Sequence, residues 1–182
     1  METTILITQP LTKGIKHLAF SADGRYLAAS AMDDDQMMAV YDWKVPPKKG
    51  KALAPIAHGK STRAKILSLG FNAAGDQVIA TCVKEVSFFS FANGAIKGQK
   101  GTGWGRTAAE SVLCQAVCGN TVFTGGYSGD IITWNGRNLK ARSKAHAGRV
   151  NCMYAKGNLL ASGGHDGKVI LHQVNGTALQ AK

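Results

Sequence analysis

The stretch Leu159–His172 reads Leu-Leu-Ala-Ser-Gly-Gly-His-Asp-Gly-Lys-Val-Ile-Leu-His and decides how the rest of the sequence is interpreted. An apolar run leads into a turn of small residues at Asp166–Gly167, and a second β-rich run, Lys168–His172, leaves it. Two such runs around a glycine turn predict a pair of antiparallel strands. His146 stands thirteen residues before Leu159, and Val150–Tyr154 predicts one more short strand between them.

The same pattern recurs three times upstream. Turn glycines repeat at offsets of about 51 residues (Gly24 and Gly75) and about 38 residues (Gly129 and Gly167). These offsets bracket the roughly 40–45-residue period of WD-type blades, each a four-stranded sheet. The three inner strands predicted for each copy are Ile15–Ser21, Tyr26–Ala31 and Met37–Trp43; Ile66–Phe71, Gln77–Cys82 and Glu85–Phe91; Val112–Val117, Thr121–Gly125 and Asp130–Trp134; and Val150–Tyr154, Leu159–Gly163 and Lys168–His172.

The predicted fold class is therefore all-β, a WD-repeat β-propeller of about four four-stranded antiparallel blades. The blades are expected at about 13–56, 64–100, 110–142 and 146–182, all within one domain of 182 residues. Their outer strands are expected at 52–56, 95–97 and 139–142, with a lone first strand at Thr3–Thr8 and a terminal stub at Thr177–Gln180. Four blades of a larger ring leave two apolar blade faces uncovered. The propeller is thus expected to be partial or half, and open unless self-association, further blades or a partner completes it.

A WD-type blade uses His, Ser or Thr, Asp and Trp as a buried hydrogen-bond chain that fixes a turn against the inner strands. The fourth copy supplies His146, Ser162 and Asp166, with His172 at the usual Trp position. The third supplies Thr124 and Trp134, and the hydroxyl position of the first two is assigned to Ser30 and Thr81. These residues are interpreted as structural, because nothing beside them provides the oxyanion site that a catalytic Ser, His and Asp require.

Composition narrows the function classes. The 45% hydrophobic content and 22 glycines suit a globular protein with many tight turns. No apolar run approaches the roughly 20 residues of a membrane span, and the N-terminus lacks a signal-peptide pattern, so a cytoplasmic protein without membrane contact is expected. The four cysteines are expected to be reduced and buried. Neither metal ligands nor a cofactor fingerprint is found, so no cofactor and no enzymatic activity are predicted.

The net charge of +11 favours a polyanionic partner. Two stretches without acidic residues, between Asp42 and Asp76 and between Asp130 and Asp166, carry much of this charge. Both cover connections between blades, which a propeller displays on its surface, although a merely solvated loop is the alternative. No aromatic stacking platform is interleaved with the charges, which argues against nucleic acid. The candidate partner-binding residues are Lys48, Lys49, Lys51, Lys60, Arg63, Arg137, Lys140 and Arg142.

Particular segments resemble the echinoderm microtubule-associated protein-like family. They include Ala31-Met-Asp-Asp-Asp-Gln-Met-Met-Ala-Val-Tyr-Asp-Trp43, Val78-Ile-Ala-Thr-Cys-Val-Lys-Glu-Val-Ser-Phe-Phe89, and Thr124-Gly-Gly-Tyr-Ser-Gly-Asp-Ile-Ile-Thr-Trp134. Lys144-Ala-His-Ala-Gly-Arg-Val150 and Ser162–Gly167 continue the resemblance, which covers residues 13 to 175 in family order. Tyr41, Phe89 and His172 at Trp positions are departures from it.

The resemblance implies a propeller that binds tubulin or microtubules, in the cytoskeleton and in some members at the cilium or spindle. The predicted function is therefore a non-enzymatic interaction scaffold, with tubulin as the expected partner. Neutralising Lys48, Lys49 and Lys51 together is expected to weaken binding to microtubules. The alternative is a WD-repeat adaptor that binds other proteins in a different complex.

Overall fold

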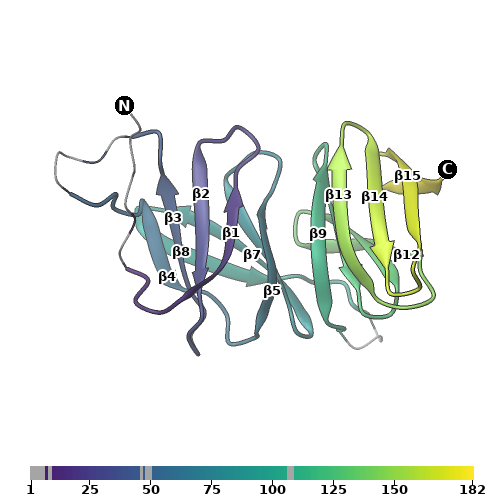
Figure 1. Ribbon diagram of the computed structural model, residues 1–182, viewed down its shortest axis with the longest axis horizontal. Helices are drawn as coiled ribbons and strands as arrows, with labels where there is room; N and C mark the ends of the chain where they lie inside the picture. Colours follow the sequence, from purple (N-terminus) through teal and green to yellow (C-terminus); the bar gives the residue numbers. More distant parts are fainter. Residues whose placement is uncertain (1–6, 8–9, 46, 48–50, 106–108) are drawn as a thin grey trace.

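The regular structure of the chain consists of β-strands. The computed structural model describes residues 7, 10–45, 47, 51–105 and 109–182, and no helix occurs in those ranges (Figure 1). Within the same ranges, no segment forms a helix long and apolar enough to cross a membrane. The predicted all-β class is confirmed.

In the described ranges, sixteen strands follow one another as four groups of four, which we call blades 1 to 4. Blade 1 contains β1 (Ile15–Phe20), β2 (Tyr26–Ala31), β3 (Met37–Asp42) and β4 (Ala57–Lys60). Blade 2 contains β5 (Ile66–Phe71), β6 (Gln77–Cys82), β7 (Glu85–Ala92) and β8 (Gly94–Lys100). Blade 3 contains β9 (Val112–Cys118), β10 (Thr121–Gly126), β11 (Asp130–Asn135) and β12 (Asn138–Lys144). Blade 4 contains β13 (Val150–Lys156), β14 (Leu159–Gly164), β15 (Val169–Asn175) and β16 (Ala178–Ala181).

Each blade is an antiparallel meander in which consecutive strands are neighbours. Blades 1 and 2 are joined further, because the outer strands β4 and β8 pair in parallel at Ala57–Gly94 and His58–Ala95. These two blades therefore form one eight-stranded sheet, whereas blades 3 and 4 are separate four-stranded sheets.

The first strands of the blades line the inside of the molecule. They contact one another in the order β1, β5, β9 and β13, so β1 and β13 stand at the two ends of the series (Figure 1). The core lies between successive blades, as three apolar clusters show. One cluster packs blade 1 on blade 2 around Ile66 and Phe89, the next packs blade 2 on blade 3 around Trp134, and the third packs blade 3 on blade 4 around Phe123.

Two expectations change, and a third falls almost entirely outside the described residues. The outer strand of blade 1 is β4, which begins directly after the predicted segment 52–56; Leu53 in that segment is instead buried against blade 1. The predicted strand Thr3–Thr8 lies outside the described residues except for Ile7, which is not in a strand. Cys152 is exposed, whereas Cys82, Cys114 and Cys118 are buried as expected.

Candidate interaction surface

A hydrogen-bond chain crosses blade 4 and connects its turn to its inner strands. His146 Nδ1 lies 2.9 Å from Asp166 Oδ1, and His146 Nε2 lies 2.9 Å from Ser162 Oγ. Ser162 Oγ is also 3.0 Å from His172 Nε2. With both imidazoles neutral, one order of protons satisfies every atom: His172 donates to Ser162, Ser162 to His146, and His146 to Asp166. His172 thus supplies the N–H that Trp would supply.

The acid at the end of this chain is strongly stabilised as a carboxylate. The backbone N–H of Ala147 donates to Asp166 Oδ2, and the backbone N–H of Lys168 donates to Oδ1. Despite some burial, these bonds and the one from His146 lower the pKa of Asp166 to about 2. The side chains of His146 and Ser162 are almost completely buried, so this Ser–His–Asp set braces the blade and offers no access to a substrate.

Blade 3 fixes the same turn with different residues. Trp134 Nε1 donates to Thr124 Oγ1 at 2.9 Å, and both side chains are fully buried. Ala108, at the position of His146, lies outside the described residues. On the turn, Ser128 stands where blade 4 has Asp166, and its backbone N–H and hydroxyl both donate to Glu110. In blade 3 the carboxylate is therefore supplied by Glu110 in the loop that faces the turn, whereas in blade 4 Asp166 supplies it from the turn itself.

The strand register corrects the assignment in the first two blades. Tyr41 pairs with Leu27 and Phe89 pairs with Val78, just as His172 pairs with Leu160. In this register the position of Ser162 is occupied by Ala29 and Ala80, one residue before Ser30 and Thr81. Because successive residues of a strand point to opposite faces, the interpretation of Ser30 and Thr81 was wrong. Their hydroxyl groups are buried without a hydrogen-bond partner among the described residues.

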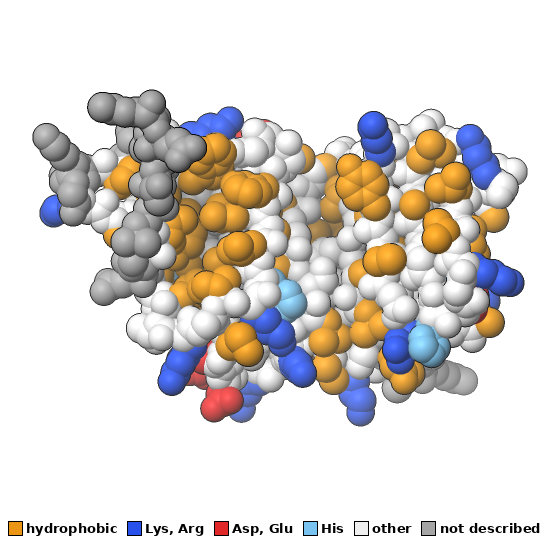
Figure 2. Space-filling model, viewed as in Figure 1, with side chains coloured by type: hydrophobic (Ala, Val, Ile, Leu, Met, Phe, Trp, Pro, Cys, Tyr) orange, Lys and Arg blue, Asp and Glu red, His pale blue; other side chains and the backbone are white. Residues whose placement is uncertain are grey.

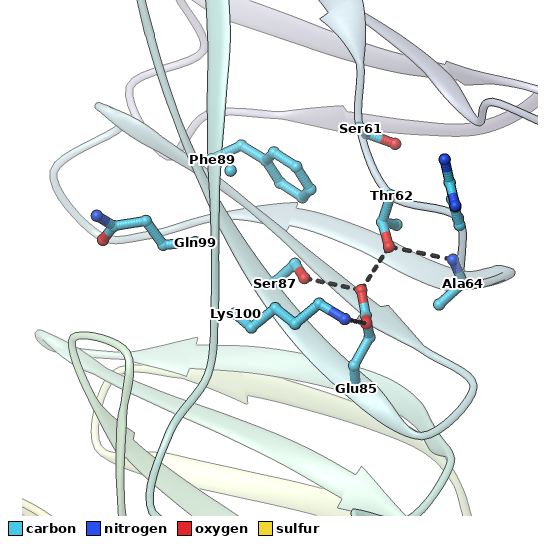
Figure 3. A pocket seen from close by; sticks show the side chains of 10 residues that line it. Ser61, Thr62, Ala64, Glu85, Ser87, Phe89, Gln99 and Lys100 are labelled. Atoms are coloured by element: carbon cyan, nitrogen blue, oxygen red, sulfur yellow. Dashed lines mark hydrogen bonds and ion pairs between the residues drawn. The ribbon is translucent and has the colours of Figure 1, made fainter.

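Blade 2 holds its loop and turn together with a carboxylate, which lines a pocket of about 350 Å³ (Figure 3). Glu85 Oε1 accepts hydrogen bonds from Thr62 and Ser87, and Lys100 Nζ lies 2.7 Å from Oε2. Burial alone would raise the pKa of Glu85, but hydrogen bonds from Lys100, Thr62 and Ser87 outweigh it and keep that pKa below its ordinary value. The carboxylate is therefore fully engaged, and Glu85 acts as a brace between Thr62 and β7.

The predicted basic residues do not form one patch. Lys48 and Lys49 lie outside the described residues. Arg137 and Lys140 lie where β12 begins, and Arg142 lies toward the opposite end of that strand. Arg142 forms ion pairs with Glu110 and Asp130, and Lys60 Nζ lies 2.7 Å from Asp35 Oδ2. Lys51 lies in the long connection between β3 and β4. Of the predicted set, Arg63 remains beside other unpaired cations.

Sequence reasoning missed the cations that the fold brings to Arg63. We call Lys16, Arg63, Lys65 and Lys84 the basic cluster. Lys16 Nζ donates to the carbonyl of Ile66, and the positive charge of Lys65 adds to desolvation in lowering the pKa of Lys16. The backbone N–H of Val83 donates to the carbonyl of Lys65, which places Lys84 next to it. Figure 2 shows Lys and Arg side chains along the lower edge of the molecule, near a few acidic ones.

Comparison with known proteins agrees with this geometry. The WD domain, G-beta repeat family matches residues 3–42 and 137–173. Echinoderm microtubule-associated protein-like 4 from Xenopus laevis is 28% identical over 90% of this chain, which covers 19% of that relative. The 77 kDa echinoderm microtubule-associated protein of Strongylocentrotus purpuratus is 29% identical over 81% of this chain, which covers 22% of it. The chain thus spans about a fifth of the length of these relatives.

Solved structures support the fold alone. The β-propeller domain of Myceliophteria thermophila Cps50 (Swd1) superposes with a TM-score of 0.76 at 14% identity, covering 95% of this chain and 59% of that one. The computationally designed Ika4 protein superposes with a TM-score of 0.71 at 18% identity, covering 96% of this chain and 100% of that one. From the repeats, the blade geometry and these comparisons, the chain is a WD-repeat β-propeller protein that is similar to echinoderm microtubule-associated protein-like proteins.

Proposed function

We propose that this chain is a non-enzymatic interaction scaffold of the cytoskeleton that binds the acidic surface of tubulin through the basic cluster. The observation that carries the proposal is the uneven pairing of charge. Glu85, Glu110 and Asp130 at the loop ends of the blades are held in internal ion pairs, and Asp166 accepts hydrogen bonds from His146 and two backbone N–H groups. The basic cluster is described with no ion pair, so its charge remains available to an acidic partner.

The names of the relatives support the choice of partner. Several of them are microtubule-associated by name, and tubulin presents an acidic outer surface to such proteins. Contacts between exposed charges weaken as salt screens them. Binding through the basic cluster should therefore fall steeply between low and physiological ionic strength.

Co-sedimentation with stabilised microtubules across a salt series tests the proposal. The double substitution Lys65→Glu and Lys84→Glu should abolish most pelleting at low salt. Lys97→Glu with Lys140→Glu is the matched control, because both side chains are exposed on outer strands and the change in net charge is the same. Equal loss of pelleting in both variants would show that binding depends only on the net charge of the protein. Unchanged pelleting of the first variant would overturn the assignment to the basic cluster.

A third variant tests the connection predicted from the sequence. Lys48→Gln, Lys49→Gln and Lys51→Gln remove three positive charges without touching the basic cluster. If this variant loses binding while the Lys65 and Lys84 variant keeps it, tubulin contacts the connection between β3 and β4 instead.

A second candidate function is a general protein adaptor, and one observation favours it. A hollow of about 590 Å³ lies between the inner strands and is lined by Phe20, Phe71, Gln115 and Tyr154 among others, without any Lys, Arg, Asp or Glu. Such a neutral, partly aromatic surface fits an apolar peptide segment better than an acidic one. Binding that persists at high salt and is lost in Tyr154→Ala, whose side chain is exposed in this hollow, would identify the adaptor function.

A further inference from the structure

Equivalent positions of the blades differ in exposure at one end of the molecule. Blade 4 buries Val150 and Leu160 against blade 3. The strand register makes Ile15 of blade 1 equivalent to Val150, and Leu27 equivalent to Leu160. No blade precedes blade 1 in the described structure, and Ile15 is 47% exposed. We call Ile15, Leu18, Phe20 and Leu27 the leading face; Leu18 and Phe20 are more than 60% exposed.

The opposite end shows the converse. Blade 3 buries Ile131 and Thr133 completely at the side that faces blade 4. Their equivalents in blade 4 are Val169 and Leu171, which are 76% and 48% exposed. We call Cys152, Tyr154, Val169 and Leu171 the trailing face. Each internal junction joins a trailing side to a leading side, so these two faces are the two halves of one more such junction.

Both faces look to the same side of the molecule. Figure 2 shows hydrophobic side chains gathered over β1 and β2 and, in the same view, over β13 and β14. A half-ring presents its two cut ends in this way. Because one flat side carries both halves of a junction, a single molecule with the same two faces can cover both at once after a twofold rotation.

We propose that a second copy of this chain covers the leading and trailing faces together and closes an eight-bladed ring. In that ring the trailing face of each copy packs on the leading face of the other, and the two junctions are related by the twofold axis. Any other single partner would need to match two different faces simultaneously.

The internal junctions predict which atoms meet at the new one. Between blades 3 and 4, Cys114 Sγ lies 3.6 Å from the carbonyl oxygen of Val150. Between blades 1 and 2, His17 Nε2, at the position equivalent to Cys114, lies 3.1 Å from the carbonyl oxygen of Ile66. Cys152 holds that position in blade 4, so its thiol should meet the carbonyl of Ile15 in the second copy.

Side chains at this pair of positions also converge. A Cβ atom placed on Gly125 would lie 2.6 Å from Cys114 Sγ and 2.8 Å from Val150 Cβ. A cysteine at position 15 should therefore come within reach of Cys152 across the junction. Cys152 is well suited as a probe, because it is exposed whereas Cys82, Cys114 and Cys118 are buried.

Sedimentation velocity of the 182-residue chain over a range of concentrations tests the assembly. We expect a species of twice the chain mass, favoured by added salt because each copy carries a charge of +11. Leu18→Asp and Val169→Asp should each raise the dissociation constant about tenfold or more, since each places a carboxylate in both junctions. Val45→Asp is the control, because Val45 is exposed on the connection after β3 and belongs to neither face.

Mixing the variants adds a stringent check. One molecule of Leu18→Asp and one of Val169→Asp share one junction with both changes and one junction with none. The mixture should therefore contain more dimer than either variant alone. Oxidation of Ile15→Cys should further give a covalently linked dimer, and Ile15→Cys with Cys152→Ser should not.

The outcomes separate cleanly. A monomer at all concentrations, open oligomers larger than the dimer, or a dimer unaffected by both Asp substitutions would overturn the proposal, as would an oxidised Ile15→Cys protein that stays monomeric. The salt dependence distinguishes it from tubulin binding, because salt should strengthen the ring and weaken the contact with microtubules. Either proposal can therefore fail without the other.

Discussion

The pair Thr124→Val and Thr81→Val gives the sharpest test of the register and of the polar braces. Valine has nearly the same shape as threonine, so each change removes a hydroxyl group and little else. Both threonines are fully buried. Thr124 Oγ1 accepts the N–H of Trp134 at 2.9 Å, whereas Thr81 Oγ1 is buried without a partner among the described residues.

The expected effects have opposite signs. Thr124→Val leaves the buried N–H of Trp134 unpaired, which costs about 1–3 kcal/mol, and the added methyl group offsets part of that loss. We expect a net loss of about 1–2 kcal/mol, or a fall in Tm of about 3–6 °C for a chain of this length. Thr81→Val removes an unpaired polar atom from the core and should be neutral or stabilising by up to about 1 kcal/mol.

Urea unfolding followed by tryptophan fluorescence measures both variants, because the buried ring of Trp134 reports on blade 3 directly. The wild-type protein and Thr121→Val, whose hydroxyl donates to the carbonyl of Gly176, complete the series. The reasoning is refuted if Thr81→Val is as destabilising as Thr124→Val, because the hydroxyl of Thr81 would then have a partner. It is equally refuted if Thr124→Val leaves the unfolding midpoint unchanged.

Three further predictions concern the braces and one junction. Burial, and after it the charge of His146, lowers the pKa of His172 below 6.5. The unfolded chain therefore takes up the proton first as pH falls, so the free energy of unfolding should keep its full value above about pH 6.5 and decline below it. Urea midpoints measured between pH 5 and 8 should show a less steep decline in His172→Phe. The pKa of Glu85 lies below 4.5 in the folded protein, so its carboxylate stabilises the fold above pH 4.5 and loses this effect as pH falls below 4.5 and through the folded pKa; Glu85→Gln should therefore cost about 2 kcal/mol at pH 7 and progressively less below pH 4.5, with a loss independent of pH counting against the brace. The variant Gly129→Ala should be much less stable than Gly136→Ala. Both glycines have positive φ, but a Cβ at Gly129 would lie 2.2 Å from the carbonyl oxygen of His146, while a Cβ at Gly136 would meet no atom within 4 Å. Similar melting temperatures of the two variants would contradict the tight contact between blades 3 and 4.

The strands were predictable because their signals are local. Alternating apolar residues and turn glycines such as Gly24 and Gly167 mark each hairpin within a few residues. Predicted and observed inner strands consequently agree to within three residues at every end, and Tyr26–Ala31 and Gln77–Cys82 agree completely. The connection before β4 was harder, because the apolar segment that looked like a strand supplies Leu53 to the core instead.

The register was not predictable at the same level. Ser162 lies two residues after Leu160, the residue that pairs with His172, whereas Ser30 and Thr81 lie three residues after the equivalent Leu27 and Val78. Nothing in the composition of Ser30 or Thr81 reveals this shift, and a shift of one residue moves a side chain to the other face. The position of the charges was hidden in the same way, because the runs visible in the sequence did not reveal that Lys16 and Lys84 each come to lie beside Lys65.

The parallel pairing of β4 with β8 gives blades 1 and 2 a shared backbone ladder at the outer rim. Opening either blade from outside must first break hydrogen bonds that belong to both, so the eight strands should exchange their amide hydrogens as one cooperative unit. Blades 3 and 4 have no such ladder between them in the described sheets and should exchange independently at their outer strands. Hydrogen exchange at the outer strands should therefore divide the described sheets into three units rather than four.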